Sequence, residues 1–287
     1  MDRRARMNVL EFFEDVYLLS HDLKEGSAVA MRTSIRALQA WNGKPIPLRS
    51  LTEERVSRFL KARKERGDSP KYLHRMRGDI LAVWREAARK GLASRPDAED
   101  VRQIRVPQRM PEAWTDGEAK AFLAACGVLL GYYDSGIARA AWWKAWTLVA
   151  WDTGLRICDL TSLRFDQFDA QGRWVVTQQK TGWGQVGSLS APAIEALRAT
   201  VPPERAVCLP WVNSLDTFRD HFRKISNAAG LSGTPKKIRK SAASALESEQ
   251  PGAAMSFLGH RTPGLAERNY LDPRISRANR PRPRQIG

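Results

Sequence analysis

The sequence predicts a mainly α-helical protein with one small β-hairpin, divided into two domains. Apolar residues recur at helical spacing, with capping residues, in both halves of the chain. Residues 172–190 instead show an alternating pattern of side chains and are rich in Val and Trp, which predicts a β-hairpin. Residues 96–111 contain three prolines and no clear periodicity of apolar residues, which predicts an extended linker between two domains.

Residues 1–95 are predicted to form a four-helix domain that is rich in Arg and Lys. Its second helix stops at Gly43. The third opens with a capping Ser or Thr, has Glu in its first turn and ends in basic residues. The fourth starts with Ser-Pro and ends in a basic turn before Gly91. The four helices are expected within residues 8–20, 27–43, 50–67 and 69–91.

The second block, residues 112–275, is predicted to be helical apart from the hairpin, which carries Gly182 and Gly184 at its centre. Thr115 or Asp116 is expected to cap its first helix. Helices are expected at residues 115–126, 138–154, 157–169 and 191–201, and from Pro235 onward. The tail, residues 276–287, is basic and is expected to be disordered when free.

Charge gives the first indication of function. The 287-residue chain has a formal net charge of +16 and a pI near 10.3. A basic chain of this size attracts a polyanion through counterion release, so nucleic acid is the expected partner. No amphipathic Lys-rich terminal helix favours a membrane surface, and the most apolar segment, residues 140–151, contains Lys144 and is too short to span a bilayer.

Two further features bear on location. The first residues are basic but no apolar run follows them, so no signal peptide is expected. The three cysteines, Cys126, Cys158 and Cys208, match neither a disulfide framework nor a zinc site. A reducing cytoplasm fits this usage best.

The stretch "TGLRICDL" places an arginine directly after a glycine that ends an apolar helix. The planar fork of Arg156 suits a phosphate, and Asp159 is expected to hold that guanidinium in place. A purely structural Arg–Asp pair at a helix start is the alternative. Lys180, in "QQKTGWG", lies at or near the hairpin tip, where it reaches either a cleft, DNA or only solvent.

A third basic group opens the helix "KKIRKSAASALES". A helix N-terminus already favours anions through its free amides and its dipole, so four cations there are typical of a phosphate site. A nonspecific basic patch is the alternative reading, and it also predicts contact with nucleic acid. The four cations are Lys236, Lys237, Arg239 and Lys240.

The last candidates lie in "LGHRTPGLAERNYLDP". His260 follows a Leu-Gly break, and Tyr270 is the only tyrosine after Tyr133. A core tyrosine usually has apolar neighbours, whereas this one is flanked by "AERN" and "LDP". Tyr270 is therefore either a nucleophile or a space-filling side chain.

Taken together and in this order, the motifs over residues 150–275 resemble the tyrosine recombinases, which include the phage integrases. Four motifs in the order of the family are a more specific signal than any one motif alone. The family pattern maps onto Arg156 and Asp159 of "TGLRICDL", Lys180 of "KTG", Arg239 of "KKIR", His260 of "LGH", and the nucleophile Tyr270.

Two positions depart from the family pattern. Lys236 stands where the family has a histidine, and it keeps the positive charge but is no proton acceptor at neutral pH. The interval from His260 to Tyr270 is one residue longer than in the family.

The resemblance implies cleavage and rejoining of double-stranded DNA through a 3′-phosphotyrosyl bond, with no metal, no nucleotide cofactor and no small-molecule substrate. It implies a homo-oligomer on DNA, from dimer to tetramer, in a cytoplasmic, bacterial or phage-encoded, nucleoid-associated setting. Residues 1–95 would be the core-binding domain and residues 112–275 the catalytic domain. The catalytic residues it implies are Tyr270, Arg156, Lys180, Arg239, His260 and Lys236, with Asp159 in support, and the expected DNA contacts are Lys237, Lys240, Arg77 and Lys71.

Two other functions fit the same residues. The fold could belong to a DNA-binding protein that no longer exchanges strands, or to a type IB-like topoisomerase acting on nonspecific DNA. The Trp-rich helix at residues 140–151 could stack on bases, but tryptophans at helical spacing are more typical of a core. The remaining histidines, His21, His74 and His221, are scattered and suggest no metal site.

Overall fold

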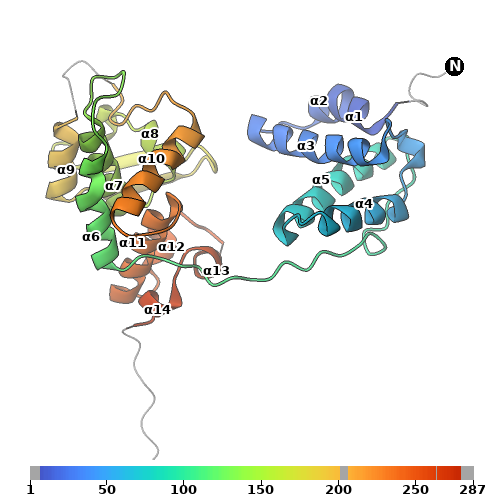
Figure 1. Ribbon diagram of the computed structural model, residues 1–287. Helices are drawn as coiled ribbons and strands as arrows, with labels where there is room; N and C mark the ends of the chain where they lie inside the picture. The colour runs from blue at the N-terminus through green and yellow to red at the C-terminus, as the bar shows by residue number, and fades with distance from the viewer. Residues whose placement is uncertain (1–6, 201–205, 263, 279–287) are drawn as a thin grey trace, which may run out of the picture. The chain divides into compact units, whose positions relative to one another are not determined.

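The computed structural model describes residues 7–200, 206–262 and 264–278, and it divides into two compact units, Met1–Gln108 and Arg109–Gly287 (Figure 1). Each unit is described by itself. The helices and the one hairpin confirm the predicted fold class.

The first unit contains the predicted helices, and the earliest of them is built from three short pieces around a π-helical turn. Side-chain caps fix two of the starts: Thr52 accepts from the Arg55 amide and Ser69 from the Tyr72 amide. Their apolar faces meet in one core. The elements are α1 (Val9–Phe12), η2 (Phe13–Tyr17), α2 (Leu18–Ser20), α3 (Glu25–Asn42), η3 (Leu48–Ser50), α4 (Glu53–Glu65) and α5 (Pro70–Arg89).

The second unit is larger and has its own core. A capping box of Thr115 and Glu118 starts its first helix, which matches the predicted cap. The elements are α6 (Asp116–Ala125), η4 (Cys126–Val128), α7 (Arg139–Thr153), α8 (Ile157–Thr161), η5 (Phe165–Gln167), β1 (Arg173–Thr177), β2 (Gly184–Ser188), α9 (Ala191–Arg198), α10 (Leu215–Ala228), α11 (Lys236–Glu249), α12 (Ala253–Phe257), α13 (Leu265–Asn269) and α14 (Pro273–Ser276).

Helix α7 is the central element of this unit, because it contacts α6, α8, α9, α11 and β2. Trp142, Trp143 and Trp146 are fully buried on it, and the Trp143 indole donates to the Tyr133 hydroxyl at 2.8 Å. Buried indoles cannot stack on bases, so the core reading of the Trp-rich helix is confirmed.

The predicted hairpin is confirmed as the antiparallel pair of β1 and β2. Val175 pairs with Val186 on its exposed face, while Trp174 and Val176 point into the core. This alternation carries the chain into the turn that holds Lys180.

The secondary structure of this unit differs from the sequence analysis in two places. Helix α8 ends at Thr161, although a helix was expected to residue 169. The hydroxyls of Thr161 and Ser162 hydrogen-bond the carbonyl oxygens of Ile157 and Cys158, which draws the last carbonyls away from a continuing helix. Helix α10 was not predicted, although Ser214 caps it and its Phe218, Phe222 and Ile225 are buried.

The chain leading into α6 is fixed to the far end of the unit. Residues 102–115 form no helix or strand. The Ala113 amide donates to the Asp272 carboxylate at 2.9 Å, and the Trp114 amide donates to the Ser241 hydroxyl at 2.7 Å. These bonds join the start of the unit to α11 and to the segment after Tyr270. Residues 279–287, most of the predicted tail, lie outside the described residues.

Candidate active site

The turn after α7 brings the first arginine to the site. Gly154 ends this helix with φ 57°, a left-handed conformation that favours glycine. A Cβ at this position would lie 2.5 Å from the Phe257 ring, so the turn also needs the space. The backbone then places Arg156 at the N-cap of α8, where its side chain is half-buried.

The Arg156 guanidinium is held by Gln178, not by Asp159. Its Nη1 donates to Oε1 of Gln178 at 2.5 Å. Oδ1 of Asp159 instead accepts from the Gln179 amide at 2.8 Å, and among the described residues no hydrogen bond joins Asp159 to Arg156. The predicted Arg156–Asp159 pair is therefore wrong. The Asp159 carboxylate therefore holds the hairpin turn at Gln179 instead.

Arg239 lies at the bottom of the site, 5% exposed, in the first turn of α11. Its Nη1 donates to the Gly154 carbonyl and its Nη2 to the Leu258 carbonyl at 2.9 Å, while its Nε has no partner. Burial lowers the pKa of this guanidinium to about 10, and the neighbouring Tyr270 opposes that shift. The group therefore remains charged at neutral pH.

Tyr270 packs against both Arg239 and His260. Its ring centroid is 5.2 Å from Cζ of Arg239 and 5.0 Å from the His260 ring, which is inclined by 57°. The short helix α13 occupies the interval between His260 and Tyr270, and the two rings meet although this interval is one residue longer than the family pattern. Tyr270 is half-buried at the C-cap of that helix.

His260 is a neutral imidazole at physiological pH. Burial lowers its pKa from 6.5 to about 4, and the charges of Arg239 and Arg156 act in the same direction, while Glu267 opposes them. The side chain is 7% exposed and its Nδ1 has no partner. A neutral ring beside a phenol is able to accept a proton.

The hairpin turn between β1 and β2 holds Lys180. Lys180 is exposed, and the turn is closed by the Gly182 amide donating to the Gln178 carbonyl at 2.8 Å. The Arg261 guanidinium lies 4.5 Å from the Trp183 ring centroid, an attractive cation–π contact. This contact joins the turn to the residue that follows His260.

Helix α11 carries three further cations, Lys236, Lys237 and Lys240. Lys236 is exposed at the first position of the helix. Nζ of Lys237 lies 3.5 Å from Oε2 of Glu112. Burial lowers the pKa of Lys240, as do the charges of Lys237 and Lys236, while Glu112 and Tyr270 oppose the shift.

The two cations predicted to bind DNA from the first unit differ in their surroundings. Lys71 is exposed near the start of α5. Arg77 is half-buried and donates to the backbone carbonyls of Ala98 and Val101. Burial lowers the pKa of Arg77, with Arg85 acting in the same direction. Its guanidinium supports the chain that follows α5, which leaves Lys71 as the more available cation.

Sequence reasoning missed four residues that shape this site: Gln178, Gln185, Trp183 and Arg261. The signal for Gln178 was present in the hairpin alternation. Trp174 and Val176 point inward, so the next inward position falls on Gln178, a polar residue where an apolar one is expected. The other three depend on contacts between distant segments, which no local pattern records.

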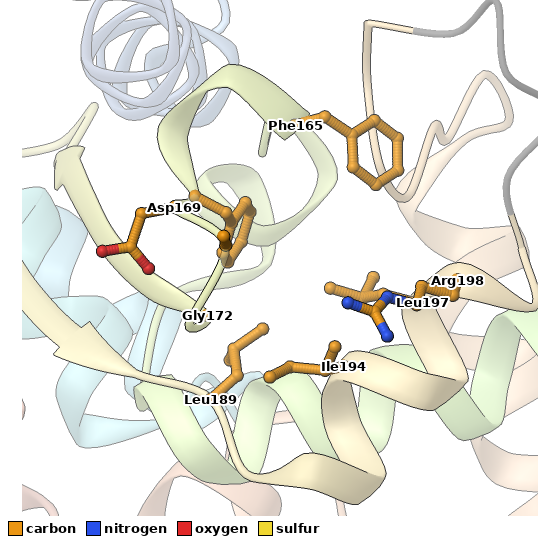
Figure 2. A pocket seen from close by; sticks show the side chains of 9 residues that line it. Phe165, Asp169, Gly172, Leu189, Ile194, Leu197 and Arg198 are labelled. Atoms are coloured by element: carbon orange, nitrogen blue, oxygen red, sulfur yellow. The ribbon is translucent and has the colours of Figure 1, made fainter.

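Within residues 7–200, 206–262 and 264–278, no group of His, Cys, Asp and Glu is arranged to hold a metal ion, and no helix is long and apolar enough to cross a membrane. Figure 2 shows a pocket between the segment Phe165–Gly172 and helix α9, and none of the predicted site residues lines it. Its visible lining includes Phe165, Asp169, Gly172, Leu189, Ile194, Leu197 and Arg198.

The described residues of this unit are mostly helical with one small antiparallel hairpin, which is the fold of the tyrosine recombinase catalytic domain. A sequence profile of the phage integrase family matches residues 118–277, and the chain belongs to that family. A comparison with curated proteins gives no match.

Solved structures with a similar fold include DNA complexes of integrases. A dimer of lambda integrase residues 75–356 bound to a COC′ core site has 20% sequence identity and a TM-score of 0.69, covering 96% of this chain and 97% of that chain. A lambda integrase tetramer bound to a Holliday junction has 18% identity and a TM-score of 0.70, covering 92% and 80%.

A structure of residues 82–397 of the Tn1549 transposon integrase in complex with circular intermediate DNA has 14% identity and a TM-score of 0.67, covering 96% of this chain and 100% of that chain. At these identities the likeness shows the fold alone.

Proposed function

We propose that this protein is a site-specific DNA recombinase or integrase that cleaves and rejoins DNA through a 3′-phosphotyrosyl intermediate, without metal or ATP. The observation that carries the proposal is the packing of Tyr270 against Arg239 and the neutral His260 within one catalytic unit. A phenol, two guanidiniums and a proton acceptor are the groups that this chemistry needs.

In the proposed cleavage step, the Tyr270 oxygen attacks the scissile phosphorus. A bond forms between that oxygen and the phosphorus, and the bond from phosphorus to the 5′-oxygen breaks. His260 accepts the phenolic proton, and Lys180 donates a proton to the leaving 5′-oxygen. A 5′-hydroxyl from a second strand then reverses the step, so the energy of the phosphoester is retained.

The arginines supply the electrostatic part of the mechanism. Arg239 and Arg156 face the developing charge on the nonbridging oxygens, a role that metals fill in many nucleases. Both guanidiniums are positioned by neutral acceptors, the Gln178 amide and backbone carbonyls, so their positive charge is not cancelled by a carboxylate bonded to them. Lys236 adds a further cation in the place of the family's histidine.

We infer that double-stranded DNA is the partner and that the protein acts on it as a homo-oligomer. The net charge of +16 supports an electrostatic, salt-dependent interaction with phosphates. The similar integrase structures contain DNA, with the lambda protein as a dimer and as a tetramer. Lys71, Lys237 and Lys240 are the cations that we expect to contribute contacts.

Covalent capture tests the proposal. A pool of duplexes with randomised cores and a nick beside the central position is incubated with the protein, and SDS-stable adducts are recovered and sequenced. The nick lets the short cleaved product diffuse away, which traps the intermediate. We expect enriched sequences with the wild-type protein, none with Tyr270→Phe, and normal recovery with Tyr132→Phe, whose tyrosine is exposed elsewhere in the unit.

Two outcomes would favour the other functions. Binding to the pool without any adduct supports a DNA-binding protein that has lost cleavage, for which Lys236 in the histidine position is the favouring observation. Adducts without sequence enrichment, together with relaxation of an arbitrary supercoiled plasmid, support a type IB-like topoisomerase.

A further inference from the structure

Two buried glutamines face each other across the hairpin beside the site. Gln178 follows β1 and is 0% exposed, and Gln185 lies on β2 and is 6% exposed. Amides buried to this degree are stable only when their hydrogen bonds are made. Nε2 of Gln178 donates to Oε1 of Gln185 at 2.5 Å.

The Gln178 amide uses its full hydrogen-bonding capacity. Its Oε1 accepts from Nη1 of Arg156 at 2.5 Å and from the Thr181 hydroxyl at 3.0 Å. Its Nε2 donates to Gln185 and to the Leu258 carbonyl at 3.3 Å. A primary amide has two lone pairs and two N–H groups, so this side chain has one orientation in the site.

Gln185 extends the network to two more backbone segments. Its Nε2 donates to the Thr153 carbonyl at the end of α7, at 3.1 Å, and to the Phe257 carbonyl at the end of α12, at 2.5 Å. Gly259 is required beside the pair, because a Cβ there would collide with the Gln178 amide. The pair therefore joins the Arg156 turn, the hairpin turn and the loop that carries His260.

We propose that Gln178 and Gln185 are positioning residues that fix Arg156 relative to Arg239 and the His260 loop. The link is direct, because the Leu258 carbonyl accepts from both Gln178 and Nη2 of Arg239. Within the described residues, Gln178 is the only hydrogen-bond partner of the Arg156 guanidinium, which leaves its other N–H groups for a phosphate. This inference rests on the proposed function.

The choice of an amide has an electrostatic reason. A glutamate at position 178 would hold Arg156 as well, but its negative charge would cancel the charge that the phosphate needs. A neutral acceptor orients the guanidinium and leaves its full positive charge available.

The test compares Gln178→Met with wild type on the duplex recovered by covalent capture. One substrate carries a normal scissile phosphate, and the other a methylphosphonate, whose methyl group replaces one nonbridging oxygen and removes the charge. Methionine keeps the volume and loses the hydrogen bonds. We expect adduct formation on phosphate to fall by about 100-fold, the effect of misplacing a reacting group by an ångström, with a much smaller loss on methylphosphonate and unchanged DNA affinity.

Controls and contrary outcomes are distinct. Gln171→Met changes an exposed glutamine of the same unit and should leave both rates unchanged. A wild-type rate in Gln178→Met, or an equal loss on both substrates, contradicts the positioning role. If Gln178→Met does not fold, Gln185→Met decides, because it removes the bond that orients Gln178: a loss of cleavage that is much larger on phosphate than on methylphosphonate supports the inference, and an equal loss on both overturns it. A wild-type protein that captures no duplex contradicts the proposed function itself.

Discussion

The ring of Tyr270 lies against the guanidinium of Arg239, with 5.2 Å between the ring centroid and Cζ, and both residues belong to one unit of one chain. The proposed nucleophile and the deepest cation of the site are thus supplied together. A single protomer therefore contains both residues in contact with each other.

This arrangement predicts that the two residues act in the same protomer. A mixture of the Tyr270→Phe and Arg239→Ala variants should not restore adduct formation, because every protomer in the mixture lacks one of the two groups. The measurement is SDS-stable adduct from equimolar mixtures on the captured duplex. Recovery of an appreciable part of wild-type activity would show that the tyrosine acts at a neighbour's phosphate.

Arg239→Lys should slow cleavage by roughly 10² to 10³-fold, the cost of losing one preorganised donor to a developing oxyanion. Lysine has one nitrogen and cannot donate to both Gly154 and Leu258 while facing the phosphate. Single-turnover rates and equilibrium binding, measured together, separate catalysis from affinity. A variant with the wild-type rate would remove Arg239 from the mechanism.

Lys180→Ala should lose most of its cleavage activity on normal DNA and recover it on a duplex with sulfur in place of the scissile 5′-oxygen. A thiolate leaves without a proton, so it bypasses a general acid. Lys120→Ala, an exposed lysine on α6, is the matched control and should react like wild type on both substrates. If the sulfur substrate does not rescue Lys180→Ala, another group protonates the leaving oxygen.

His260 should titrate near pH 4 in the free protein, well below its usual 6.5, because of burial and two nearby guanidiniums. NMR of the imidazole carbons across pH 3.5 to 7.5 measures this. The unfolded chain binds the proton more readily, so the contribution of His260 to stability is complete above pH 6.5 and is lost as the pH falls towards 4.

The matched variant for this titration is His260→Gln, in which stability should change less between pH 6.5 and 4 than in the wild type. A midpoint for His260 near 6.5 would contradict the burial of the imidazole beside the two guanidiniums.

Much of the fold followed from local patterns in the sequence. Thr52, Ser69 and Thr115 cap the helices they were expected to cap or begin, and the alternation around Trp174 and Val176 gave the hairpin. These features depend on residues within a few positions of one another. Helix α10 has comparable local features, a Ser214 cap and apolar residues at helical spacing, so it too could have been predicted from the sequence.

The details of the site were less accessible because they depend on long-range contacts. The partner of Arg156 is a residue 22 positions away rather than the acid three positions on. Gln178 reaches Leu258 across 80 positions, and only the folded unit brings them together. The order of the motifs indicated the family and the candidate reactive residues. The hydrogen bonds and packing contacts between these residues could be seen only in the tertiary structure.

The most direct test of the account is to identify the residue that carries the DNA in the trapped adduct. Trypsin should release Asn269–Arg274, the peptide that contains Tyr270, and mass spectrometry should find it linked to a nucleotide through a 3′-phosphate, with a free 5′-hydroxyl on the other DNA end. A link on a different residue, such as the exposed Tyr132, or a 5′-phosphate link to Tyr270, would contradict it.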